Sequence, residues 1–148
     1  MSANCGQFSL LCRQWLPQAK IYAFEPLQQP ADKFNAIFGN DPGTGLVQAA
    51  IGPVSSELNM HVSKAVDSSS LLPIGAKQSA IFPGTEESHL ERVRIAPLDA
   101  FVDREALSAR ALLKIDVQGY ELEVLRGCEA LLDRFAAVYV ECSFVELY

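Results

Sequence analysis

Residues 111–116 have the sequence ALLKID, an apolar run that ends in a carboxylate. Two further runs follow the same rule, because IYAF at 21–24 precedes Glu25 and VYV at 138–140 precedes Glu141. Short apolar runs bounded by polar residues are typical of buried strands. We therefore predict three strands, each of which is followed by an acid.

Helical periods lie between these strands. Apolar residues from Phe8 to Leu16 have helical spacing up to Pro17, and a second helix is expected around Pro30. Further helices are predicted over 121–126 and 129–135. This alternation favours an α/β fold, with a mostly parallel sheet and helices on both of its faces.

Parallel strands would place the acids along one rim of the sheet. Ligands bind outside the carboxyl ends of the strands in open parallel sheets, so Glu25, Asp116 and Glu141 are candidate ligand residues. The alternative is that acids follow strands only because loops are polar. Three acids in succession favour the ligand rim.

The middle of the chain is less regular. We predict one strand over 46–51 and a half-exposed strand over 58–62, joined as a hairpin by 52–56. Residues 67–88 are predicted to form a long loop with one helical turn, and a strand resumes near 92–95.

Composition limits the class of protein. The 148 residues are 49% hydrophobic and 20% charged, with a net charge of -6, which suits a single globular domain over residues 1–148. No run of Lys or Arg suggests a nucleic-acid partner, and no apolar run is long enough for a membrane span. The cysteines form no C-x-x-C pair, and no signal peptide is visible, so we expect a cytoplasmic protein without a metal.

A second argument supports Glu25 as a ligand-binding residue. A loop of small and polar residues, Ser2 to Gly6, precedes the first helix, and Glu25 follows Gly6 by 19 residues. A carboxylate at about this distance beyond a glycine loop is suited to accept the ribose hydroxyls of a nucleoside. Because the loop is not G-x-G-x-x-G, it does not specify a dinucleotide.

Several segments together resemble the FkbM methyltransferase family. They are ANCGQFS at 3–9, AFEP at 23–26, PLD at 97–99, KIDVQGYE at 114–121, ELEVLRG at 121–127 and VE at 140–141. The resemblance implies a Rossmann-like class I methyltransferase fold and an S-adenosylmethionine cofactor. It also implies O-methylation of a hydroxyl on a small-molecule or carbohydrate acceptor, such as a sugar or secondary metabolite.

The resemblance also implies roles for particular residues. Asp116 is the first candidate for a base or an acceptor-orienting group, Glu141 is the second, and His61 or His89 could reach in from loops. Ser69 and Ser70 are candidate substrate contacts, although a flexible serine loop is the alternative. The predicted cofactor residues are Ala3, Asn4, Gly6, Glu25, Pro26, Ala50, Ile51, Gly52 and Asp116.

The chain departs from the family pattern at both ends. Family members start with a strand that ends D-x-G-A-N, and they continue through two final strands after the position of Glu141. We therefore expect a partial domain, shortened at both ends, that self-associates through exposed strand edges. A noncatalytic nucleoside-binding or scaffolding remnant is the alternative function, and an NAD-dependent reductase would need more loop glycines.

Overall fold

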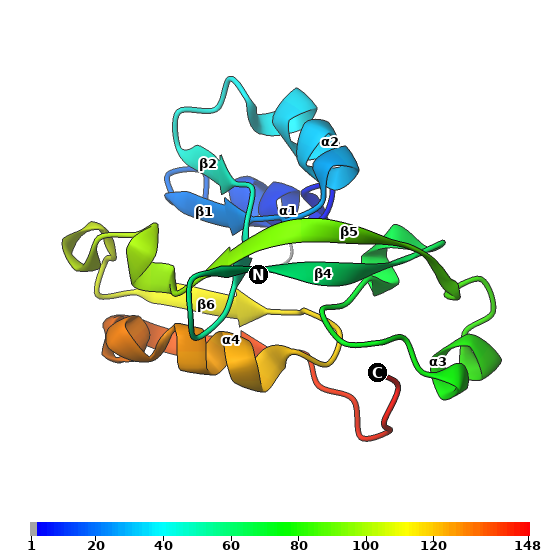
Figure 1. Cartoon of the computed structure of the whole chain (residues 1–148). Coiled ribbons are helices and arrows are strands. Elements are labelled where there is room, and N and C mark those ends of the chain that lie inside the picture. The colour runs from blue at the N-terminus through cyan, green and yellow to red at the C-terminus, as the bar shows by residue number, and fades with distance from the viewer. Residues whose placement is uncertain (1–2) are drawn as a thin grey trace.

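The computed structural model describes residues 3–148, and the loop residue Ser2 lies outside this range. Helices and strands alternate along the chain, as the sequence predicts (Figure 1). The helices are α1 (Gln7–Trp15), α2 (Gln28–Phe38), α3 (Ala76–Ile81) and α4 (Glu121–Gly127). The strands are β1 (Ile21–Phe24), β2 (Thr44–Val47), β3 (Ala50–Ile51), β4 (Ser56–Ser63), β5 (Glu87–Ala96), β6 (Ala111–Ile115) and β7 (Phe135–Val140). Short 3₁₀ helices cover Val66–Ser68, Leu98–Ala100, Arg104–Ala106 and Glu129–Arg134.

The strands form small sheets instead of one continuous sheet. β1 pairs with β2 and β6 pairs with β7, both in parallel, while β5 lies between β3 and β4. The mixed α/β character and the parallel pairs agree with the predicted class. Within residues 3–148, however, β1 and β6 each form a ladder with one neighbour, so a full Rossmann sheet is not seen.

Side-chain packing joins the sheets where hydrogen bonds do not. Phe24 of β1, Ile51 of β3 and Ile115 of β6 belong to one buried cluster, together with Val124 and Cys128 from the α4 region. Figure 1 shows α4 next to β6, below it in the view, and the cluster joins the two elements through Ile115 and Val124. The carboxyl ends of β1 and β6 are therefore held near one another by the core.

The predicted hairpin is wrong. Residues 46–51 are split into β2 and β3, because the Ala49 N–H donates to the Val47 carbonyl (2.9 Å) and turns the chain between two sheets. β3 and β4 do not pair with each other, since both pair with β5, one parallel and one antiparallel. The ten-residue β5 is longer than expected and has room for β4 along its length.

The last strand is also less buried than predicted. Val138 and Tyr139 of β7 are 43% and 53% exposed, and Leu112 of the neighbouring β6 is 52% exposed. The sheet formed by β6 and β7 is therefore covered mainly on the side of α4.

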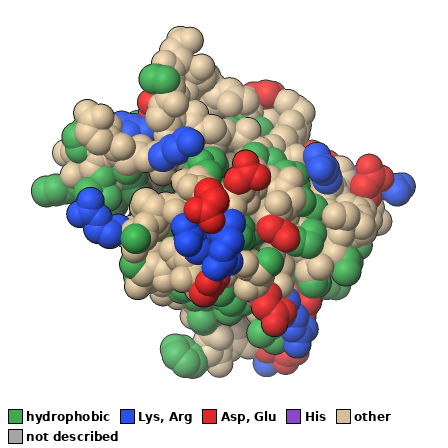
Figure 2. Space-filling view, turned by 90° about the vertical axis from the view of Figure 1, so that its left-hand side faces the viewer, with side chains coloured by type: hydrophobic (Ala, Val, Ile, Leu, Met, Phe, Trp, Pro, Cys, Tyr) green, Lys and Arg blue, Asp and Glu red, His purple; other side chains and the backbone are tan. Residues whose placement is uncertain are grey.

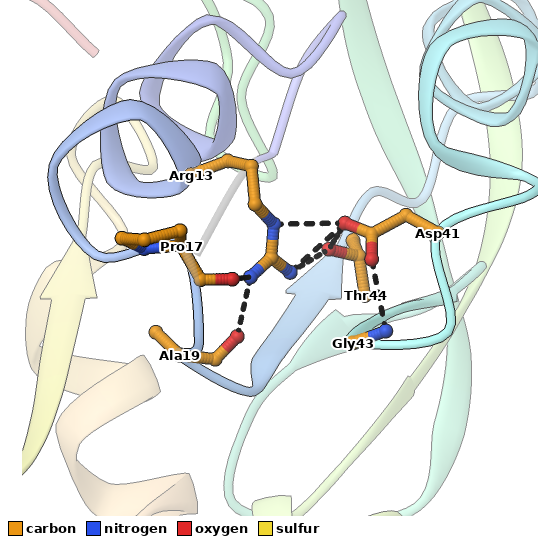
Figure 3. Close-up of polar contacts among 6 residues, drawn as sticks. All are labelled: Arg13, Pro17, Ala19, Asp41, Gly43 and Thr44. Atoms are coloured by element: carbon orange, nitrogen blue, oxygen red, sulfur yellow. Dashed lines mark hydrogen bonds and ion pairs between the residues drawn. The ribbon is translucent and has the colours of Figure 1, made fainter.

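A cluster of hydrogen bonds around Arg13 connects the end of α1 to the sheet formed by β1 and β2 (Figure 3). Arg13 donates to the Asp41 carboxylate (2.9 Å), the Thr44 hydroxyl (2.8 Å) and the carbonyls of Pro17 and Ala19 (both 2.8 Å). The Thr44 hydroxyl and the Gly43 N–H donate to the same carboxylate. The planar guanidinium thereby fixes α1 relative to the starts of β1 and β2.

The surface carries mixed charge. Figure 2 shows Lys and Arg side chains next to Asp and Glu on one face of the molecule. The ion pairs include Arg92 with Glu57 at 2.7 Å. In the part of the chain that the structure describes, no helix is long and apolar enough to cross a membrane.

Candidate active site

The loop that precedes α1 is tied directly to Glu25. The Asn4 N–H donates to Glu25 Oε2 (2.8 Å), and the Leu27 N–H donates to Glu25 Oε1 (3.1 Å). A bond from the Ala3 N–H to the Phe24 carbonyl (2.8 Å) fixes the same loop against β1. The Glu25 side chain therefore faces the glycine loop, as the sequence predicts, although Glu25 is only 2% exposed.

Gly6 is required by this arrangement. Its φ of 94° lies in the left-handed region, which favours glycine. A Cβ at this position would also lie 2.7 Å from Phe38 Cε2 and 3.2 Å from Phe34 Cδ2, on α2. The glycine thus allows α1 to begin close against α2 and places the loop beside Glu25.

A small apolar pocket opens beside Glu25. Three predicted cofactor residues, Pro26, Ala50 and Ile51, line it, and so does Ser69. The remaining lining residues are Phe24, Ala49, Met60, Leu71, Val117, Tyr120 and Val124. The pocket therefore extends from the residues that flank Glu25 to those that follow Asp116.

The cavity is small as it stands. Its volume is about 30 Å³, which is enough for water but not for a purine ring. Adenine could be accommodated only if lining side chains such as Met60 or Leu71 moved. Met60 is suited to such a movement because methionine side chains are unbranched and flexible.

Gly52 has a packing role next to the pocket. A Cβ at Gly52 would lie 2.4 Å from Ile95 Cδ1, and a Cβ at Gly127 would lie 2.5 Å from the Gly52 carbonyl oxygen. Gly127 allows α4 to pack directly on the backbone that follows β3, and Gly52 leaves room for the Ile95 side chain of β5. Gly52 thus supports the pocket wall, although it is not among the residues that line the pocket.

Asp116 is held by two donors. Lys114 Nζ donates to Oδ2 (2.8 Å) and Gln118 Nε2 donates to Oδ1 (3.0 Å). Lys114 and Asp116 thus form an ion pair at the end of β6. The two donors fix the orientation of the Asp116 carboxylate, which is partly exposed. Asp116 is not among the residues that line the pocket, although its neighbour Val117 is.

Glu141 is placed differently. Its backbone N–H donates to the Ile115 carbonyl (3.0 Å) and so extends the pairing of β6 with β7, but the residue is exposed. Glu141 follows β7 at the same end of the sheet as Asp116, yet it is not among the residues that line the pocket.

The serine segment is well ordered by its hydrogen bonds. Ser69 Oγ accepts from the Ser63 N–H (3.1 Å). Ser70 Oγ donates to the Gln118 carbonyl (2.6 Å) and accepts from the Leu72 N–H (3.0 Å). Both serines are buried, so the flexible-loop alternative is not what the structure shows, and only Ser69 contributes to the pocket wall.

Both histidines lie on the β4–β5 ribbon beside acids. His61 Nδ1 contacts the Glu87 carboxylate, and His89 Nε2 lies 4.0 Å from Glu91 Oε2. Neither histidine lines the pocket.

The sequence analysis did not select four of the residues that line the pocket, Met60, Leu71, Val117 and Tyr120. Burial raises the pKa of the Tyr120 hydroxyl, with a smaller contribution from Glu123. Val117 and Tyr120 belong to the segment KIDVQGYE, so their position directly after Asp116 was the available signal. Met60 and Leu71 reach the pocket from β4 and the following loop, and no local motif marks them.

The profile of the family described as "Methyltransferase FkbM domain" matches residues 3–148. The chain belongs to the FkbM methyltransferase family. It is also 28% identical over 138 residues to "Methyltransferase 1" of Beauveria bassiana (strain ARSEF 2860). The aligned region covers 85% of this chain and 55% of that protein. The chain thus spans about half the length of this curated relative. No solved structure shows a significant match.

Membership of the FkbM methyltransferase family agrees with the geometry at Glu25. The match includes the glycine loop, Glu25 and the segment around Asp116, which the core brings to one end of the strands.

Proposed function

We propose that this chain forms the S-adenosylmethionine site of an O-methyltransferase whose acceptor is a hydroxyl of a sugar or secondary metabolite. The observation that carries the proposal is the Glu25 carboxylate, which ends β1, faces the glycine loop and lies between two pocket residues, Phe24 and Pro26. Family membership supports methyl transfer.

The chemistry of these residues suits the methyl donor. Glu25 orders the backbone at Asn4 and Leu27, and a carboxylate after this strand is the kind of group that accepts from the hydroxyls of a ribose. The apolar pocket wall suits the faces of adenine, once some of the side chains that line the pocket move to make room for the ring. When bound, the sulfonium of S-adenosylmethionine would supply an activated methyl group.

The residues of this chain then have two tasks in methyl transfer. They must hold the acceptor oxygen in line with the methyl carbon and the sulfur, since much of the rate of such a displacement comes from positioning. They must also receive the hydroxyl proton, and Asp116 is the proposed base or orienting group because two donors fix its carboxylate next to the pocket residue Val117. Glu141, which is exposed, is a weaker proposal.

A noncatalytic nucleoside-binding or scaffolding role is the second candidate. The cavity volume of about 30 Å³ favours the scaffolding form of this candidate, because the pocket as it stands does not accommodate adenine, which a bound nucleoside would also require. In either role we propose a cytoplasmic location, which the free thiols of Cys5, Cys12, Cys128 and Cys142 support.

Calorimetry with S-adenosylmethionine and S-adenosylhomocysteine tests the proposal. The wild-type chain should bind both in a saturable manner. Glu25→Gln, which keeps the size of the side chain, should weaken binding about tenfold to a hundredfold, since a hydrogen bond to a charged group contributes about 1.5–3 kcal/mol. Glu129→Ala, at an exposed position, is the matched control and should bind normally.

The outcomes separate the candidates. If Glu25→Gln binds with undiminished affinity, Glu25 has no ribose role. If the folded wild-type chain binds neither compound, the scaffolding candidate replaces the enzyme. Transfer of labelled methyl from S-adenosylmethionine to sugar hydroxyls then tests O-specificity.

A further inference from the structure

Tyr148 packs on the turn that follows β6. Its Cβ and Cδ2 lie 3.1 Å and 3.4 Å from the position that a Cβ on Gly119 would occupy, so the ring rests directly on the glycine. The carbonyl of the preceding residue, Leu147, accepts from the Gly75 N–H (2.9 Å). This segment is therefore held at two points against the loop and turn beside the pocket.

The hydroxyl of Tyr148 begins a path of hydrogen bonds that leads to Asp116. It lies 3.1 Å from Gln118 Oε1 and 3.2 Å from the Ser68 carbonyl oxygen, and its one hydrogen is shared between these acceptors. Gln118 Nε2 then donates to Asp116 Oδ1 (3.0 Å). Lys114 Nζ holds the other oxygen of the same carboxylate at 2.8 Å.

The path fixes the orientation of the Gln118 amide. Its NH₂ group must face the Asp116 carboxylate, because a carbonyl oxygen there would face another acceptor. The Tyr148 hydroxyl satisfies the amide oxygen on the other side, so each end of the amide has a complementary partner.

The backbone of Gln118 also needs support. Its φ of 57° is left-handed, which is uncommon for a residue other than glycine, and Gly119 follows with a φ of 98°. The buried hydroxyl of Ser70 donates to the Gln118 carbonyl (2.6 Å) and holds this conformation. Backbone and side chain of Gln118 are thus fixed by different residues, Ser70 and Tyr148.

We infer that Tyr148 is a positioning residue for the proposed methyl transfer. Tyr148 acts through the Gln118 amide, which holds the Asp116 carboxylate in one orientation. The inference rests on the proposed function, in which Asp116 orients or deprotonates the acceptor hydroxyl. Burial, followed by the nearby carboxylates of Asp67 and Glu121, raises the pKa of Tyr148 to about 12, so the hydroxyl stays protonated and remains a donor.

The test uses NMR of the full chain, with and without S-adenosylhomocysteine. Tyr148→Phe keeps the ring on Gly119 and removes only the hydroxyl. The rotation of the Gln118 side-chain amide should become about twofold to tenfold faster, which corresponds to the loss of one hydrogen bond. The carboxyl carbon signal of Asp116 should shift as well. Tyr22→Phe, on β1, is the matched control and should change neither signal.

A second variant keeps the inference falsifiable. Gln118→Leu should shift the Asp116 carboxyl signal in the same direction as Tyr148→Phe and by at least as much, because it removes the donor to Asp116 itself. Adding Tyr148→Phe to Gln118→Leu should cause no further shift. If Tyr148→Phe is folded but leaves the amide rotation and the Asp116 signal unchanged, the inference is overturned, even if the chain binds S-adenosylhomocysteine. Absence of S-adenosylhomocysteine binding to the wild-type chain would instead overturn the proposed function, together with the role assigned to Tyr148 in it.

Discussion

Substitution of Gly127 by alanine should destabilise the protein, although alanine is the better helix former. The added Cβ would lie 2.5 Å from the Gly52 carbonyl oxygen and 2.9 Å from Gly52 Cα, whereas ordinary contact begins at 3.4 Å. The obstacle is backbone, which cannot rotate away as a flexible side chain could. The helix or the segment after β3 must therefore shift by most of an ångström.

Two opposing effects set the expected magnitude. Alanine in α4 gains up to about 1 kcal/mol of helix propensity over glycine. Overpacking against a fixed backbone costs about 3 kcal/mol, at the upper end of the usual range. The net loss should be about 2 kcal/mol, or roughly 6 °C in melting temperature for a chain of this size.

Urea unfolding followed by circular dichroism measures this loss. Gly45→Ala is the control, because a Cβ at Gly45 in β2 meets nothing within 4 Å, and it should change stability by less than about 0.5 kcal/mol. A Gly127→Ala protein as stable as the wild type would refute the close packing of α4 on Gly52. The same variant should bind S-adenosylhomocysteine more weakly, since Gly52 follows the pocket residue Ile51.

Two further predictions concern titration and thiol reactivity. The pKa of Asp41 is held below its usual value by the Thr44 hydroxyl, the Gly43 N–H and then Arg13. The ionised Asp41 carboxylate therefore stabilises the folded protein at pH values above its usual pKa, and this contribution is lost as the pH falls through the lowered pKa. The difference in urea midpoint between wild type and Asp41→Asn should therefore shrink as the pH is lowered from about pH 5 to pH 3. A difference independent of pH would show that the ionised Asp41 carboxylate does not stabilise the fold. Burial raises the pKa of Cys128 to about 11, whereas Cys142 is exposed. Iodoacetamide at pH 8 should therefore label Cys142 well before Cys128 in the native protein, as peptide mass mapping would show, and equal labelling rates would argue against a buried Cys128.

The sequence predicted best where local patterns and tertiary packing agree. The runs that became β1 and β6 are short, apolar and followed by acids, and both strands lie in the shared core. Glu25 was found for the same reason, because a glycine loop, a strand and an acid follow one another closely in sequence. The Asn4 bond to its carboxylate then follows from the order of these elements.

The errors arose where pairing is decided over long distances. Residues 46–51 have a continuous strand pattern, and nothing local shows that Ala49 turns back toward Val47. The position of β5 between β3 and β4 depends on distant partners, such as Ala50 with Ile95 and Ser56 with the same Ile95. The contact of Tyr148 with Gln118 likewise joins residues 30 positions apart, and no motif includes both.

The hydrogen bonds of Glu25 have a consequence for affinity. Because this carboxylate already fixes the backbone at Asn4 and Leu27, the glycine loop before α1 has its shape before any ligand arrives. Little chain entropy remains to be lost there when a nucleoside binds. Any conformational cost of binding should instead fall on the side chains that line the small pocket, so that their rearrangement, more than ordering of the loop, would limit the affinity.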